Sequence, residues 1–149
     1  MFLYLSKFLI ISLMIATCIS CGKKNGIVTV TESRSYTLVN TSTGSPTSAG
    51  IVVITKLTDG KASLSIDLAA AYRVPSVIMK ASITTMSNGA EVTYSDLGNV
   101  DGTTGKGAVG VVLISTSGLA VTYNDLVAKA GYVIRIMNGT TLQASTTIN

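Results

Sequence analysis

The residues of this chain that could do chemistry are few, and its two cysteines stand out because of where they lie. Cys18 and Cys21 are three residues apart near the N-terminus, and no cysteine follows them; the chain has no histidine. A Cys-x-x-Cys pair can act in redox chemistry, but here it falls beside an apolar N-terminal run rather than inside a domain. The other chemistry open to a cysteine at such a place is acylation of its thiol.

The segment before Cys21 has the composition of an export signal. A lysine precedes an apolar run from Phe8 to Ala16, and small residues follow. A helix that stays in the membrane needs about 20 apolar residues, so this shorter run favours a cleaved signal. The pattern CISCG resembles a bacterial lipobox, with Ser20 as the small residue before an acylated Cys21. Cys18 is the alternative acceptor, and an ordinary cleaved signal is a further alternative.

We therefore predict three parts of the chain. Residues 1–20 are a lipoprotein signal peptide, residues 21–35 form a tether and a first strand, and residues 36–149 form one domain with a core of its own. Lys23 and Lys24 adjoin the predicted lipid. The expected location is the cell envelope, anchored through the lipid to a bacterial membrane, with the outer membrane as the first choice and the domain periplasmic or surface-exposed.

The remaining basic residues give no support for a nucleic-acid partner. Nucleic-acid binding needs basic side chains clustered with stacking aromatics or on a groove-reading helix. Here they are scattered singly along the chain, at Arg34, Lys56, Lys61, Arg73, Lys80, Lys106, Lys129 and Arg135.

The glycine-rich segment NVDGTTGKG invites comparison with a phosphate-binding loop, but it lacks the required residues. Val100 stands where the first glycine belongs, Gly107 stands where serine or threonine belongs, and a strand is expected next in place of a helix. A turn that holds the side chain of Asp101 by bonds to the backbone is the preferred interpretation. Calcium at Asn99 and Asp101 is the alternative.

No enzyme signature is found. General acid or base chemistry without histidine needs paired carboxylates or an activated lysine. The carboxylates that could take part are interpreted as loop or cap residues: Glu91, Asp96, Asp101 and Asp125. No cofactor is expected.

The elements that position these residues are strands. KASLSIDL alternates apolar and polar residues with a period of two, and it follows a β-branched run across Asp59 and Gly60, so Gly50 to Leu68 is predicted to be a hairpin. SNG and TSG are predicted turns, and Asn40 to Gly50 is a predicted loop. The other predicted strands are Ile27–Val30, Tyr36–Val39, Val77–Thr84, Gly110–Ile114, Tyr132–Met137 and Thr141–Ile148. Such spacing is typical of an antiparallel sandwich or barrel, and we expect an all-β, Greek-key-like β-sandwich.

One short helix is expected near residues 122–130. Thr122 is followed three residues later by Asp125, a spacing that caps a helix start, and Gly131 can end the helix in a left-handed conformation.

The same six-residue pattern occurs earlier, in VTYSDL. Thr93 and Asp96 have the capping spacing, and Gly98 follows at once, so a turn is predicted there. The similarity ends after six residues, far short of a repeat period of about 20 to 50, which favours a shared capping device over a duplicated module.

Three segments together resemble a known family. SAGIVVITKLTDGKASLSIDL, YSDLGNVDGTTGKG and VTYNDLVAKAGYVIRIM, in this order and spacing, resemble the CHRD (chordin) domain as it occurs in bacterial envelope lipoproteins. The resemblance covers roughly Val39 to Ile148. It implies an all-β sandwich, export and an interaction role.

The chain departs from that family at one place. Bacterial members often carry a histidine-rich segment after the hairpin, and the resemblance places its three histidines on Val74, Val77 and Met79. A copper or zinc site needs convergent imidazole, thiolate or carboxylate ligands. We therefore expect no metal site here, and we expect Val77 and Met79 to lie in a strand and pack in the core.

Together these expectations describe a lipid-anchored cell-envelope binding or structural module without catalytic activity. Its expected contacts are the membrane, through the N-terminal lipid, and a protein partner. One alternative is a degenerate sandwich that binds copper or zinc. Another is an adhesin or assembly subunit that uses an exposed sheet edge for strand addition.

Overall fold

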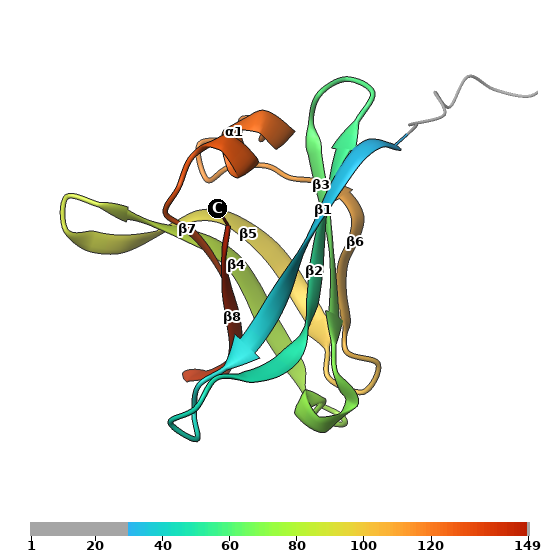
Figure 1. Ribbon diagram of the computed structural model, residues 1–149, viewed down its shortest axis with the longest axis vertical. Coiled ribbons are helices and arrows are strands. Elements are labelled where there is room, and N and C mark those ends of the chain that lie inside the picture. Colours follow the sequence, from blue (N-terminus) through green and yellow to red (C-terminus); the bar gives the residue numbers. More distant parts are fainter. Residues whose placement is uncertain (1–29, 149) are drawn as a thin grey trace, which may run out of the picture.

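The computed structural model describes residues 30 to 148, which form a closed antiparallel barrel of eight strands (Figure 1). The predicted signal peptide, the tether before residue 30, Cys18 and Cys21 lie outside the described residues. The elements, in chain order, are β1 (Val30–Asn40), β2 (Thr47–Leu57), β3 (Ala62–Leu68), the 3₁₀ turn η1 (Ala70–Tyr72), β4 (Ile78–Ser87), β5 (Ala90–Asp101), β6 (Lys106–Val112), α1 (Tyr123–Ala128), β7 (Tyr132–Asn138) and β8 (Thr141–Ile148).

The prediction of an all-β antiparallel fold with one short helix is confirmed, but the prediction of a sandwich is wrong. Around the barrel the order is β1, β2, β3, β6, β5, β4, β7 and β8, and β8 returns to β1 through the pair Val39 and Ser145. Two connections join strands that are not neighbours, from β3 to β4 and from β6 to β7. A sandwich and a barrel both bury one face of each strand, so the alternating sequence pattern does not distinguish them.

The predicted hairpin from Gly50 to Leu68 is confirmed as β2 and β3. The two strands pair without interruption from Gly50 opposite Leu68 to Lys56 opposite Ala62. The amide of Leu57 donates to the carbonyl of Lys61 at 2.9 Å, and Gly60 supplies the positive φ, +79°, that the tight turn requires.

The sequence-based predictions need correction at β1 and at β5, which is not among the predicted strands. β1 is one continuous strand from Val30, and β2 begins at Thr47, inside the predicted loop. The turn predicted at Asp96 and Gly98 is wrong, because β5 continues through it with a bulge in which Leu97 is the extra residue. Gly98, at φ +78°, donates its amide to Asp96 Oδ1 at 2.8 Å. The same local hydrogen bond and glycine occur in turns and in bulges. The sequence of this segment therefore does not distinguish the two, and the pairing of β5 with β4 determines which one forms.

The predicted helix is confirmed as α1, which caps one end of the barrel (Figure 1). Thr122 Oγ1 accepts the amide of Asp125 at 3.1 Å, which is the predicted N-cap. Tyr123 and Leu126 are buried beneath the helix, and the amide of Tyr123 donates to the carbonyl of Gly60 at 3.1 Å. Among residues 30 to 148, the structure contains no helix with the length and apolar character needed to cross a bilayer.

Side chains fill the barrel interior, as is usual for a barrel of eight strands. One hydrophobic cluster contains nearly all of the buried apolar residues of the barrel and of α1. Its largest fully buried members are Leu38, Ile54, Leu64, Ile66, Leu68, Met79, Ile83, Tyr123, Leu126, Ile134, Ile136 and Ile148. The surface open to a partner is therefore the outer wall.

Candidate functional site

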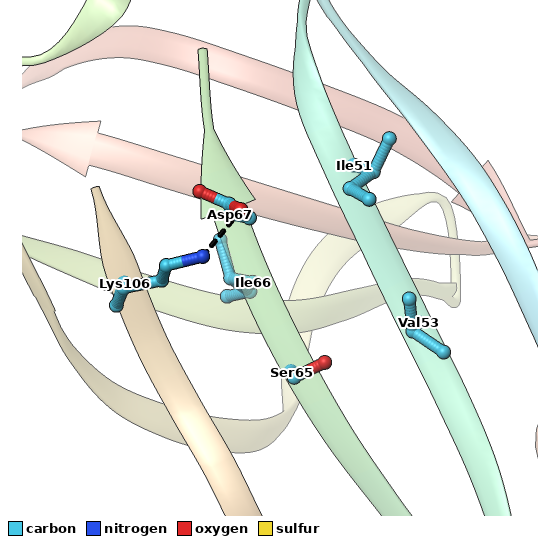
Figure 2. A pocket seen from close by; sticks show the side chains of 6 residues that line it. All are labelled: Ile51, Val53, Ser65, Ile66, Asp67 and Lys106. Carbon is cyan, nitrogen blue, oxygen red and sulfur yellow. Dashed lines mark hydrogen bonds and ion pairs between the residues drawn. The ribbon is translucent and has the colours of Figure 1, made fainter. Parts of the chain in front are cut away.

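The outer wall carries a hollow of about 490 Å³ over β2, β3 and β6 (Figure 2). Ile51 and Val53 from β2 form an apolar side, and Ser65 and Asp67 from β3 form a polar side. Lys106, the first residue of β6, lies on the other side of β3 from Ile51 and Val53. We call this hollow the Asp67 groove.

The strand register explains why these side chains meet. Ile51 pairs with Asp67, and Val53 pairs with Ser65, so an apolar residue of β2 faces a polar residue of β3 at two alternate pairs of the ladder. Lys106 pairs with Asp67 from the other side. Because the alternate residues of β2 and β3 are buried in the core, all of these side chains point to the outer surface.

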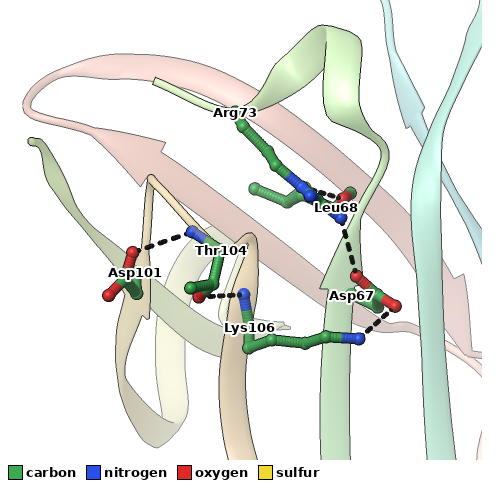
Figure 3. Close-up of polar contacts among 6 residues, drawn as sticks. All are labelled: Asp67, Leu68, Arg73, Asp101, Thr104 and Lys106. Atoms are coloured by element: carbon green, nitrogen blue, oxygen red, sulfur yellow. Dashed lines mark hydrogen bonds and ion pairs between the residues drawn. The ribbon is translucent and has the colours of Figure 1, made fainter. Parts of the chain in front are cut away.

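Asp67 is held between two cations (Figure 3). Lys106 Nζ donates to Asp67 Oδ2, and Arg73 Nη2 lies 3.5 Å from Asp67 Oδ1. The Arg73 side chain is fixed by a second contact, because its Nε donates to the carbonyl of Leu68 at 3.0 Å. Oδ1 of Asp67 is itself buried and accepts no hydrogen bond from the described residues. The groove thus offers one carboxylate and two cations beside an apolar wall.

A second hollow, of about 250 Å³, continues the groove toward η1 and shares Ile51 and Asp67 with the first. Gly50 forms part of its floor. A Cβ at Gly50 would lie 2.3 Å from the carbonyl oxygen of Asp67, and φ there is +145°. Only glycine allows β2 to approach β3 this closely beside Asp67.

The glycine-rich segment positions the cations of the groove. Gly105, at φ +74°, lies against Arg73, and a Cβ there would be 2.7 Å from Arg73 Nε. The predicted turn around Asp101 is confirmed, since Asp101 Oδ1 accepts the amides of Thr103 at 2.7 Å and Thr104 at 3.0 Å. Figure 3 shows the bond from Thr104. The hydrogen bonds from the Thr104 and Thr103 amides lower the pKa of Asp101 below its usual value.

The calcium alternative at Asn99 and Asp101 gains no support from this geometry. Asn99 Oδ1 accepts Lys80 Nζ at 2.7 Å, so a cationic side chain already lies where a metal ion would have to bind. Within residues 30 to 148, no group of three or more His, Cys, Asp or Glu side chains is placed to hold a metal ion.

The other carboxylates singled out in the sequence lie apart. Glu91 and Asp96 are in β5 rather than in loops, which corrects the prediction; Asp101 ends that strand. Glu91 Oε1 lies 2.6 Å from Arg135 Nε and accepts the Thr84 hydroxyl at 2.6 Å. Asp125 lies in the first turn of α1, as predicted for a cap.

Asp125 has a local structural role. Hydrogen bonds from Thr122 and Lys129, followed by the charge of Lys129, lower its pKa. Lys129 Nζ lies 3.2 Å from Asp125 Oδ1. Its contacts are therefore those of a helix cap rather than of a catalytic pair.

The structure places the three positions matched to histidines on one short segment. Met79 is fully buried in β4, which confirms the predicted core position. Val77 lies one residue before β4, so its predicted place in the strand is wrong, although it packs against the core as a half-buried side chain. Its carbonyl accepts the amide of Gly102 at 2.9 Å. Val74 is half-buried.

The residues of the Asp67 groove carry no signal of a site in the sequence. There Asp67 is a polar position in an alternating strand, and Arg73 and Lys106 are two of the scattered basic residues. Lys106 is 39 residues from Asp67, and the β3–β6 register that joins them is not a local property of the sequence.

Comparisons of the chain with models of known protein families, with curated proteins and with solved structures find no match. The fold and the site together define a small closed antiparallel barrel that carries a mixed-charge groove on its outer wall.

Proposed function

We propose that this protein is a lipid-anchored cell-envelope binding module without catalytic activity, and that the Asp67 groove is its binding surface. The CHRD relationship belongs to this proposal as well. The three segments that resemble the family support it, whereas the closed barrel departs from the sandwich that the family implies.

The observation that carries the proposal is the position of the groove relative to the anchor. Ile51 pairs with Thr37 of β1 on one side and with Asp67 of β3 on the other, so Asp67 lies level with Thr37. Thr37 is seven residues beyond Val30, roughly 23 Å along an extended strand. The groove therefore lies on the wall of the barrel, away from the residue at which the predicted tether joins it.

The chemistry of the groove supports binding more than catalysis. Lys106 Nζ already donates to Asp67, so the amine that a Ser-Lys pair would need beside Ser65 is occupied by a carboxylate. Ile51, 47 % exposed, provides apolar contact area, and Arg73 and Lys106 provide donors to an acidic or carbonyl group.

Fractionation of cells tests the anchor. Cys21→Ser should move the protein from the membrane to the soluble fraction and abolish labelling by a fatty-acid analogue, because each buried CH₂ of the lipid contributes about 0.8 kcal/mol to membrane binding. Cys18→Ser is the matched control and should stay in the membrane. Retention of Cys21→Ser, or release of Cys18→Ser alone, would refute the assignment of Cys21.

Affinity capture from a native envelope extract tests the groove. Ile51→Asp should abolish capture of the partner by the purified protein, since it places a charge in the apolar wall. Val92→Asp is the control, because Val92 has similar exposure, 41 %, on the β4–β5 hairpin. Equal capture by the parent and both variants would exclude the Asp67 groove as the binding surface.

Elemental analysis of the dialysed protein separates the proposal from the degenerate metal-binding alternative. The binding-module proposal expects neither copper nor zinc in stoichiometric amount. Stoichiometric metal that also raises the melting temperature would favour the alternative.

A further inference from the structure

The first strand of the barrel has a free edge. β1 pairs with β2 from Val30 to Asn40, but among the described residues its register with β8 consists of Val39 opposite Ser145. Toward its N-terminal end β1 diverges from β8, as Figure 1 shows. The side chains from Val30 to Ser35 are exposed. Unpaired backbone groups along such an edge can pair with another strand.

The sequence of this edge is complementary to itself. When two antiparallel copies of β1 pair about Ser33, Glu32 of each copy lies opposite Arg34 of the other. The same register places Thr31 opposite Ser35. Opposite charges facing each other across two strands stabilise their pairing, and like charges destabilise it.

The alternative registers lack this complementarity. A two-fold axis normal to the sheet leaves every side chain on the same face of the sheet. Residues that pair across two antiparallel strands also share a face, so in a symmetric dimer one residue must lie on the axis opposite its own copy. Pairing about Glu32 would place two carboxylates together, and pairing about Arg34 would place two guanidinium groups together. The charges thus exclude the neighbouring registers and select Ser33.

Both charged side chains are available for such contacts. Arg34 is exposed and forms no ion pair with the described residues. The side chain of Glu32 is 48 % exposed, and its ion pair with Lys56 is long, at 3.9 Å. Glu32 also accepts the Tyr123 hydroxyl at 3.2 Å through Oε1. Charged residues on an edge strand usually prevent pairing, but here their order permits pairing with one partner, a second copy of this chain.

We propose that two copies of this chain associate through the free edges of β1, paired antiparallel about Ser33. In this dimer each Val30 lies three residues from the two-fold axis, roughly 10 Å. The two predicted tethers leave near the centre, and the Asp67 grooves remain open on β2 and β3. The inference does not use the groove, so its failure would leave the binding proposal untouched.

Charge reversal tests the pairing in the full chain, purified in detergent and examined by sedimentation equilibrium. The parent should dimerise, and Glu32→Arg and Arg34→Glu should each weaken dimerisation at least tenfold, since each places like charges opposite one another. The double variant Glu32→Arg with Arg34→Glu restores opposite charges and should restore the dimer. A parent that stays monomeric, single variants that dimerise like the parent, or a double variant as weak as the single ones would each overturn the proposal.

Cysteine cross-linking tests the register. In the Ser33→Cys variant the two introduced thiols face each other across the axis, within the Cα separation that a disulfide allows. Mild oxidation should therefore give a covalent dimer. The Thr37→Cys variant is the control on the same edge, because its two thiols would lie roughly 26 Å apart. The parent chain, with Cys18 and Cys21, sets the background. Equal cross-linking of the Ser33→Cys and Thr37→Cys variants, or no product from Ser33→Cys above the background, would refute the register.

Discussion

At the scale of single residues, one side chain of this barrel does not follow the usual rules of burial. The hydroxyl of Tyr36 is buried and has no hydrogen-bond partner among the described residues. Asp67 Oδ1 and Arg135 Nε are also buried, but each lies in an ion pair, with Arg73 and Glu91 respectively. An unpaired buried polar group costs free energy, so the Tyr36 hydroxyl needs an explanation. Nothing in the structure explains the Tyr36 hydroxyl.

Tyr36→Phe should therefore be neutral or stabilising. The ring of Tyr36 packs against the core, and the substitution removes only the unpaired hydroxyl. We expect the free energy of unfolding to stay the same or to rise by up to about 1 kcal/mol. Urea denaturation measures this change, and a loss of more than about 1 kcal/mol would show that the hydroxyl makes a stabilising bond.

Gly50→Ala should be strongly destabilising. Its Cβ would meet the backbone of β3, which cannot move without separating the two strands, and φ +145° is unfavourable for alanine. We expect a loss of about 3 kcal/mol in the free energy of unfolding, from strain and from displaced backbone.

Gly44→Ala is the control for backbone strain alone. Gly44 also has a positive φ, +83°, but a Cβ there meets no atom within 4 Å. Its cost should be about 1 kcal/mol. If Gly50→Ala and Gly44→Ala have the same melting temperature, the close contact of β2 with β3 at Gly50 does not add to the cost of the substitution.

At the scale of elements, the sequence predicts those whose determinants are local. The hairpin of β2 and β3 follows from alternation and a turn at Asp59 and Gly60, and α1 follows from the Thr122 cap. The course of β5 cannot be predicted in this way, because Asp96 and Gly98 form a bulge with the same local signal as a turn. The Asp67 groove cannot be predicted either, because it depends on the register of β3 with β6.

Removing the cap of α1 should affect stability alone. Thr122→Ala deletes the acceptor of the Asp125 amide and should cost about 1 kcal/mol, whereas Thr122→Ser keeps the acceptor and should cost little. Thermal unfolding measures both. Loss of partner capture by Thr122→Ala at an unchanged melting temperature would show that the cap has a binding role instead.

The cap also gives a dependence on pH. The hydrogen bond from Thr122, then the hydrogen bond from Lys129 and its charge, lower the pKa of Asp125 in the folded state. The stabilisation is therefore complete above the unfolded pKa of about 4 and is lost as the pH falls through the lower folded pKa. Asp125→Asn should be less stable than the parent at neutral pH, and the difference should shrink in acid. A difference that does not change with pH would contradict this assignment.

At the scale of the whole molecule, the barrel has a well-packed interior and an incompletely paired junction, or seam, between its first and last strands. Closure rests on the pair Val39 and Ser145, supported by the side-chain amide of Asn40, which donates to the carbonyl of Gln143 at 2.6 Å. No local pattern in the sequence indicates that two strands so distant along the chain would meet, so the sequence does not distinguish a barrel from the expected sandwich. Beyond this pair the edge of β1 is free for association. The Asp67 groove lies on β2 and β3, on the other side of β1 from that edge.

The central claim, that the Asp67 groove is the binding surface of an envelope protein, is tested most directly by photo-crosslinking in intact cells. A photo-reactive amino acid replaces Ile51 in the groove, or, as control, Met86, which is 64 % exposed on the β4–β5 hairpin. We predict a discrete cross-linked product from position 51 that is absent from position 86 and is lost when Lys106→Glu is added. No product from position 51, or the same products from both positions, would contradict the account.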